Sequence, residues 1–293
     1  MLLGEYAVLY GKPAVVCAVD KHITVTLTPR ADQRIIINSA TLGHYETDLL
    51  TLKIEQPFQF VLGALKHFQT KCRRGCDIEI TAEFSEQIGF GSSAAVTVAT
   101  IAVLVTWLDM RVTQMDLLRH ARNVIRSVQG VGSGADAAAS IYGGVVAYQQ
   151  QPLTAEKFTL TYPLAVLYAG FKTPTVEAIQ RVQDRFSTQK SLFRHLMASI
   201  GQCAIEGAEL LRKENWQAFG DIMTIQQGMM DALGVNVPAL QTCVNELRSC
   251  SDIIGAKISG SGFGDCAVGL GQCALTQQLN VAMTTQGVHC EKI

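Results

Sequence analysis

The stretch Gly89-Phe90-Gly91-Ser92-Ser93-Ala94-Ala95 joins a glycine-rich turn to an uncharged run over residues 94–108. We expect the uncharged run to form a buried helix, because it has no polar face to turn toward water. Glycines let backbone N–H groups converge, and a helix start adds unpaired amides and the positive end of its dipole. Of the two serine hydroxyls, one is placed to cap the helix and the other to reach a metal ion on a phosphate. The stretch indicates a polyphosphate site, and the alternative is a plain capped core helix.

The glycine spacing argues against two common nucleotide patterns. A P-loop would have a Lys directly before the first Ser and more widely spaced glycines. A third glycine loop, Gly260-Ser261-Gly262-Phe263-Gly264-Asp265, follows a predicted strand, as a dinucleotide fingerprint would. Its glycines are spaced GxGxG, however, and no βαβ unit follows, which disfavours a dinucleotide oxidoreductase.

Composition limits the class of protein and the partners. The chain has 293 residues, of which 48% are apolar and 17% charged. This length is enough for one large or two ordinary domains with buried cores. A net charge of -1 gives no electrostatic reason for binding nucleic acid or a membrane surface, and the apolar run is shorter than the ~20 residues that span a bilayer. Without a secretory signal pattern, we expect a cytoplasmic monomer or homodimer with a small-molecule substrate. The nine scattered cysteines are expected to be reduced.

Hydrophobic periodicity predicts strands and helices throughout the chain. The predicted strands cover residues 14–27, 34–38, 77–84, 145–148, 164–168, 256–258 and 266–270, and the predicted helices cover 58–68, 94–108, 113–128, 136–141, 175–212, 216–233 and 238–250. The polar run Gln149-Gln150-Gln151-Pro152 combines a composition shift with a proline. It predicts two domains, over residues 1–152 and 153–293.

Asp136 is the strongest candidate for catalysis. It ends the loop Gln129-Gly130-Val131-Gly132-Ser133-Gly134-Ala135-Asp136 and opens a predicted helix of small residues. A carboxylate there can accept a hydroxyl proton or help to hold Mg²⁺. The alternative is structural, because an acid in the first helical turn is favoured by the dipole.

Four stretches together resemble the GHMP kinases, a family of small-molecule kinases. The first motif of the family resembles the stretch Gly4-Glu5-Tyr6-Ala7-Val8-Leu9-Tyr10-Gly11-Lys12-Pro13-Ala14. Residues 89–95 resemble the second motif, and residues 257–266 resemble the third. The Asp136 loop resembles the family loop that carries the catalytic aspartate. The resemblance implies an α+β fold of two domains. These are an N-terminal domain like ribosomal protein S5 domain 2 and a ferredoxin-like C-terminal domain, with ATP and substrate bound between them.

The resemblance also implies roles for individual residues. Asp136 would be catalytic, and Ser93 would bind Mg²⁺. The residues expected to bind ATP are Glu5, Gly89, Gly91, Ser92, Ser93 and Ala94, and those expected near the substrate are Lys12, Ser133, Gly134, Lys172, Gly260, Ser261, Gly262, Arg122 and Arg126. Arg122 and Arg126 share one helix face with Arg119, and the alternative for these arginines is a solvated basic face.

Three details favour the mevalonate-pathway branch of the family, with phosphomevalonate as the acceptor and mevalonate as the alternative. The first motif reads Gly-Glu-Tyr where mevalonate kinases usually have Gly-Glu-His. The catalytic loop begins with Gln129 in place of a His, and Asp265 stands before Cys266 where those kinases tend to have a glycine.

Two departures from the family pattern qualify these expectations. Many members carry a Lys six positions before the Glu matched by Glu5, a position that would precede Met1, so the first strand is expected to be truncated. Ile125 stands where mevalonate kinases carry a Mg²⁺-binding Glu. A phosphate acceptor is already ionised at neutral pH and needs no strong base. With such an acceptor, the absence of one of these two groups would matter less. A non-catalytic, ligand-binding relative is the rival interpretation.

Overall fold

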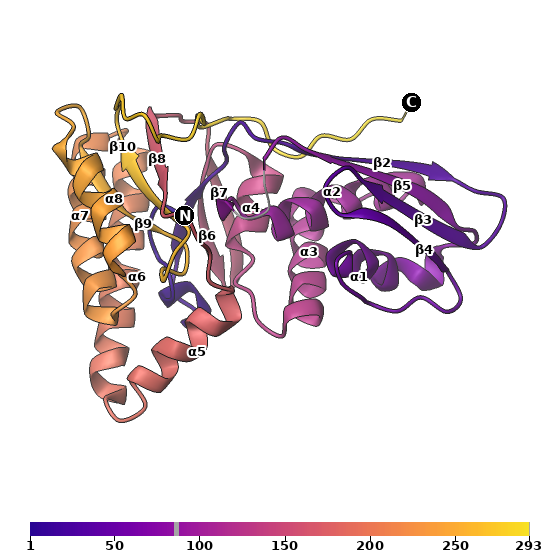
Figure 1. Cartoon of the computed structure of the whole chain (residues 1–293), viewed down its shortest axis with the longest axis horizontal. Coiled ribbons are helices and arrows are strands. Elements are labelled where there is room, and N and C mark those ends of the chain that lie inside the picture. Colours follow the sequence, from indigo (N-terminus) through magenta and orange to yellow (C-terminus); the bar gives the residue numbers. More distant parts are fainter. Residues whose placement is uncertain (85–87, 293) are drawn as a thin grey trace. The chain divides into compact units, whose positions relative to one another are not determined.

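A computed structural model describes residues 1–84 and 88–292, and its chain forms two compact units that interleave in the sequence (Figure 1). Unit 1 contains residues 1–20, 88–90 and 143–286. Unit 2 contains residues 21–84, 91–142 and 287–292. The boundary expected at residue 152 falls inside unit 1, in the turn of a hairpin, and the division into 1–152 and 153–293 stays a prediction.

Unit 2 is built on a four-stranded sheet. Its strands are β2 (Ile23–Pro29), β3 (Arg34–Ser39), β4 (Gly43–Asp48) and β5 (Cys76–Ala82), in the order β2-β5-β3-β4. The β3–β5 pair is parallel and the other two pairs are antiparallel. Alternate residues such as Ile35 and Ile37 are buried, as period-two patterning requires.

The helices of unit 2 are α1 (Gln59–Phe68), α2 (Ser92–Trp107), α3 (Gln114–Gln129) and α4 (Ala135–Tyr142), with a short 3₁₀ turn η2 (Gln69–Lys71) after α1. Helix α2 contacts β2, α1, α3 and α4, which explains why its sequence carries no charge. The hydroxyls of Thr97 and Thr100 donate to carbonyls four residues earlier, each at 2.7 Å. The predicted buried helix is confirmed.

Helix α3 begins as its sequence predicts. The Thr113 hydroxyl accepts the Asp116 N–H at 3.1 Å, and the Asp116 carboxylate accepts the Thr113 N–H at 3.1 Å, which completes a capping box. None of the described helices in either unit is long and apolar enough to span a membrane.

Unit 1 contains two antiparallel three-stranded sheets. One has the order β1-β6-β7, with β1 (Ala14–Cys17), β6 (Val145–Gln150) and β7 (Leu153–Phe158). The other has the order β8-β10-β9, with β8 (Leu164–Tyr168), β9 (Gly255–Ser259) and β10 (Cys266–Leu270). The 3₁₀ turn η1 (Ala7–Tyr10) precedes β1.

The described part of unit 1 also contains four helices. They are α5 (Thr175–Arg185), α6 (Lys190–Arg212), α7 (Trp216–Leu233) and α8 (Pro238–Ser249), of which α5 and α6 are salmon and α7 and α8 orange in Figure 1. Helix α7 contacts β9, α8 contacts β10, and α6 contacts α7 and β1. Phe219 and Met223 of α7 share a buried core with Val268 of β10.

A buried polar network crosses the core of unit 1. Glu5 is 2% exposed and forms an ion pair with Lys257 of β9, which is 0% exposed. The Gln226 amide of α7 donates to the second Glu5 carboxylate oxygen, and its own oxygen accepts the Gly4 N–H at 3.0 Å. Burial lowers the pKa of Lys257, and the negative charge of Glu5 opposes that shift. Glu5 thereby attaches the N-terminal segment to both α7 and β9.

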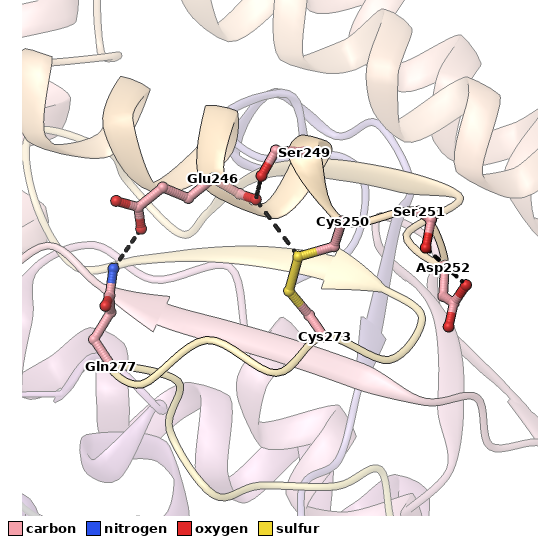
Figure 2. The surroundings of a disulfide bond; sticks show 7 residues. All are labelled: Glu246, Ser249, Cys250, Ser251, Asp252, Cys273 and Gln277. Atoms are coloured by element: carbon pink, nitrogen blue, oxygen red, sulfur yellow. Dashed lines mark hydrogen bonds between the residues drawn. A yellow bond between two sulfur atoms is a disulfide. The ribbon is translucent and has the colours of Figure 1, made fainter.

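One pair of cysteines departs from the expected reduced state. Cys250, at the end of α8, forms a disulfide with Cys273, which follows β10 (Figure 2). The Cα atoms lie 5.9 Å apart, although the two residues are separated by 23 positions in the sequence. The expectation of reduced thiols is therefore wrong for this pair, because β10 returns the chain to the end of α8. The other seven cysteines are free.

We expect Lys257→Met to lower the free energy of unfolding by about 3–5 kcal/mol, because it leaves the Glu5 carboxylate buried without its cation. Urea denaturation measures the loss. Adding Glu5→Gln removes the orphaned charge and is expected to restore much of the stability. If the free energy of unfolding of Lys257→Met were within about 1 kcal/mol of the wild-type value, that result would contradict this role of the pair.

Candidate active site

The start of α2 in unit 2 presents backbone amides at one point. Gly91 is the N-cap, with φ +73° and ψ +30°, and its carbonyl accepts the N–H groups of Ala94 and Ala95 at 2.9 and 3.0 Å. Ser92 and Ser93 are the first two helical residues, whose N–H groups have no acceptor within the helix. Because glycine occupies the N-cap, no side chain caps α2, and the expected serine cap is wrong. Ser92 is buried and Ser93 is partly exposed.

The Asp136 carboxylate lies against this helix start. Asp136 is in the first turn of α4 and is exposed. A Cβ atom at Gly91 would lie 3.2 Å from the Asp136 Cβ atom and 3.6 Å from its Oδ2 atom. Glycine at position 91 thus permits both the left-handed backbone and the close approach. The structure brings together the acid and the loop that the sequence singled out separately.

The loop before Asp136 is held by its own neighbours. The Arg126 Nε atom donates to the Gly132 carbonyl at 3.1 Å, and the Ser133 hydroxyl accepts the Ala135 N–H at 3.2 Å. The Gly134 carbonyl accepts the Ala138 N–H at 3.0 Å and so begins the bonding of α4. These contacts fix the end of the loop from which Asp136 projects.

Position 125 has a packing role. Ile125 is 7% exposed, and a Cβ atom at Gly132 would lie 2.9 Å from its Cγ2 atom. The side chain therefore supports the loop before Asp136 through apolar contact. An isoleucine offers no oxygen to a cation, which agrees with the departure noted in the sequence.

The three arginines of α3 do not form one uniform face. Arg119 is exposed and pairs with Asp116 at 2.7 Å, the ordinary state of a solvated helix arginine. Arg126 is partly buried and contacts the loop before Asp136, and Arg122 is also partly buried. Arg122 and Arg126 stay candidates for binding substrate.

In unit 1, the third glycine loop is held by contacts along its length. The Tyr6 hydroxyl donates to the Ser261 carbonyl at 2.6 Å, the Phe263 N–H donates to Val235 at 2.8 Å, and the Thr173 hydroxyl donates to the Phe263 carbonyl at 2.7 Å. At Gly262 a Cβ atom would lie 2.6 Å from the Val235 Cβ atom, so a glycine is required there. The sequence motif contained Tyr6, but its role in holding this loop was not predicted.

The other predicted residues of unit 1 lie in different surroundings. Glu5 has both carboxylate oxygens bonded inside the protein, so we assign it a supporting role for the first and third motifs, and its part in nucleotide binding stays a prediction. Lys12 is exposed, and its aliphatic stem lies on α6, where a Cβ atom at Gly201 would be 2.8 Å from the Lys12 Cβ atom. Lys172 is exposed in the segment after β8. Gly260 lies near the carboxylate of Asp265. In the sequence, Asp265 stood out only as a residue that differs from the mevalonate kinase motif.

The donor atoms of unit 2 suit a hard divalent cation only in part. The Ser93 hydroxyl and the Asp136 carboxylate are oxygen donors of the kind that Mg²⁺ takes. Within the described part of the chain, no group of three or more His, Cys, Asp or Glu residues is placed to hold a metal ion. The fit therefore requires the phosphate oxygens of a ligand and water to complete the coordination.

Family models match both units. The model for the GHMP kinases N terminal domain matches residues 59–144, and that for the GHMP kinases C terminal matches residues 208–272. The chain belongs to the GHMP kinase family. It is therefore a phosphotransferase with the mixed helix and sheet fold of that family, as its motifs indicated.

Individual relatives and solved structures agree with this assignment. A mevalonate kinase of Pyrococcus abyssi is 29% identical over 290 residues, which covers 92% of this chain and 85% of the relative. The structure of a Lin0012 protein from Listeria innocua has a TM-score of 0.83 at 21% identity and covers 93% of this chain and 88% of its own. A Streptococcus pneumoniae phosphomevalonate kinase in complex with phosphomevalonate and AMPPNP has a TM-score of 0.79 at 17% identity and covers 93% and 90%. The two structures are similar to this chain in fold.

Gly91→Ala is expected to lower kcat by at least about 10-fold, because the new methyl group crowds the Asp136 side chain and shifts it by a few tenths of an ångström. Gly43→Ala is the matched control. Gly43 also has a positive φ, +85°, but nothing lies within 4 Å of its Cβ position. Both variants should lose about 1–2 kcal/mol of stability from backbone strain, and only Gly91→Ala should lose turnover. Equal activity in the two variants would show that the contact has no catalytic role.

Proposed function

We propose that the protein transfers the γ-phosphoryl group of ATP to a small-molecule acceptor of the mevalonate pathway. The observation that carries the proposal is the Asp136 carboxylate lying against Gly91, at the amide-rich start of α2. Phosphoryl transfer needs an anion site for the polyphosphate and a side chain that orients the attacking group. In unit 2, the start of α2 is suited to the first task and Asp136 to the second, and their closeness supports the proposal.

The residues of this site have separate tasks. The N–H groups of Ser92 and Ser93, with the positive end of the α2 dipole, favour the negative charge of the polyphosphate. Asp136 is exposed and orients the acceptor hydroxyl or accepts its proton. Mg²⁺, when bound with the nucleotide, would neutralise charge on the phosphates, and Ser93 is the residue proposed to contact it.

We propose mevalonate as the acceptor. The mevalonate kinase of Pyrococcus abyssi is similar over most of this chain, whereas the phosphomevalonate kinase is similar in fold at lower identity. The relatives thus support the alternative of the sequence analysis better than its first choice. An alcohol acceptor must lose a proton during transfer, which gives the exposed Asp136 carboxylate a specific task.

Phosphomevalonate is the second candidate because of position 125. Ile125 is buried against Gly132, so this helix supplies no acidic metal ligand there. A phosphate acceptor is already ionised and needs positioning more than it needs a base. Arg122 and Arg126, one turn apart and partly buried, are cations suited to hold such a group.

A coupled ADP-release assay with mevalonate, phosphomevalonate, homoserine and galactose tests the proposal. We expect the highest kcat/KM with mevalonate, and Asp136→Asn should lower kcat by about 10²–10⁴-fold. Asp109→Asn is the matched control, because Asp109 is exposed in the same unit and pairs with Lys292.

Each of the other outcomes of this assay has a definite meaning. Turnover with phosphomevalonate alone would replace the first candidate by the second. No turnover with any acceptor would refute the proposal and favour the non-catalytic, ligand-binding relative.

A further inference from the structure

Arg126 of α3 bonds at two points to the loop that precedes Asp136. Its backbone carbonyl accepts the N–H of Gly130, the C-cap of α3, at 2.8 Å. Its Nε atom donates to the Gly132 carbonyl at 3.1 Å. The first bond is an ordinary helix end, whereas the second requires a partly buried arginine to turn back onto the chain that leaves its own helix. Arg126 therefore holds the chain at both ends of residues 130–132.

The residue before Arg126 occupies the space beside the same glycine. A Cβ atom at Gly132 would lie 2.9 Å from the Ile125 Cγ2 atom, and Gly132 has φ +156°, which other residues rarely adopt. Ile125 is 7% exposed, so its side chain has little room to move aside. Two consecutive residues of α3 thus hold Gly132, Ile125 by apolar contact and Arg126 by a hydrogen bond.

The place of Asp136 depends on Gly132 and on α3. Three residues separate Gly132 from Asp136, and bonds within the loop and the first turn of α4 hold them. At the other end of α4, the Gln114 side chain of α3 donates to the Ile141 carbonyl at 3.4 Å. Helix α4 packs on α3 and is also attached to it near both of its ends. A shift of Gly132 relative to α3 would therefore move the Asp136 carboxylate relative to the start of α2.

We propose that Arg126 is a positioning residue for Asp136, an inference that rests on the proposed function. It acts through the Gly132 carbonyl, and this task is the same for an alcohol and for a phosphate acceptor. A displacement of about 1 Å in a reacting group can lower the rate about 100-fold. Loss of the bond therefore reduces turnover more than it weakens the binding of either substrate. A direct contact with an acceptor phosphate would instead raise the KM of phosphomevalonate.

The test compares two arginines of the same helix in the full chain. Arg126→Met removes the donor and keeps an apolar stem, and Arg119→Met makes the same change at an exposed arginine that pairs with Asp116. The kcat and both KM values are measured with ATP and with mevalonate or phosphomevalonate. For Arg126→Met we expect kcat to fall about 10–100-fold, with each KM within about 3-fold of the wild type. For Arg119→Met we expect kcat within about 2-fold of the wild type, because exposed ion pairs contribute little.

Three further measurements separate positioning from a general loss of structure. In an Asp136→Asn background, Arg126→Met should cost no more than about 3-fold in kcat, because the carboxylate that it positions is gone. Without substrates, Arg126→Met should speed amide hydrogen exchange over residues 130–135, and Arg119→Met should not. Arg126→Lys keeps the charge without the Nε donor and serves if the methionine variant folds poorly. The same loss of kcat at unchanged KM is expected for it, to a smaller extent.

Several outcomes would overturn the inference while the proposed function stands. A wild-type kcat or an unchanged exchange rate in Arg126→Met would show that the bond does not position the loop. A raised acceptor KM at unchanged kcat would show that Arg126 contacts the acceptor. Equal losses of kcat in the wild-type and Asp136→Asn backgrounds would show a role that does not act through Asp136. If the wild type turns over neither acceptor, the proposed function itself fails, and this inference fails with it.

Discussion

The ion pair between Glu5 and Lys257 is the constraint on which the glycine loops of unit 1 depend. Removing two charges from water is costly, and such a pair persists only when further hydrogen bonds satisfy its remaining atoms. Here Gln226 bonds to Glu5, and Lys257 also donates to the Ile258 carbonyl. The pair joins residues 252 positions apart in the sequence. It attaches the N-terminal motif to the strand from which the third glycine loop begins, and Tyr6 then bonds to that loop directly.

The two units use glycine for the same purpose. In unit 2, Gly91 allows the Asp136 carboxylate to approach the start of α2, and in unit 1, Gly89 allows the Asp265 carboxylate to approach the same stretch of chain. Both glycines have φ near +74°, so both also provide a backbone turn that other residues adopt at a cost. Asp136 is exposed, whereas Asp265 is buried. The two carboxylates therefore differ in their access to water.

Elements with a strong local pattern could be predicted from the sequence, and elements that depend on distant partners could not. The strands at 164–168 and 266–270 and the helix at 216–233 match β8, β10 and α7, because their apolar periodicity is their own. Strand β4 was missed because none of its residues is fully buried and it forms by pairing with β3. The motifs identified Asp136 and Gly91 separately, but their contact depends on the packing of α2 against α4. The Glu5–Lys257 pair and the disulfide have no local signal, because both join residues far apart in the sequence.

Phosphorus NMR of the whole reaction tests the central claim most directly, because it identifies both the group transferred and the group that receives it. The protein is mixed with ATP, Mg²⁺ and mevalonate, and spectra are recorded over time. The account predicts that the ATP signals are replaced by those of ADP while one new phosphomonoester signal grows in equal amount. With phosphomevalonate, transfer would instead produce two coupled signals of a diphosphate. ATP spectra that stay unchanged with both acceptors would contradict the account.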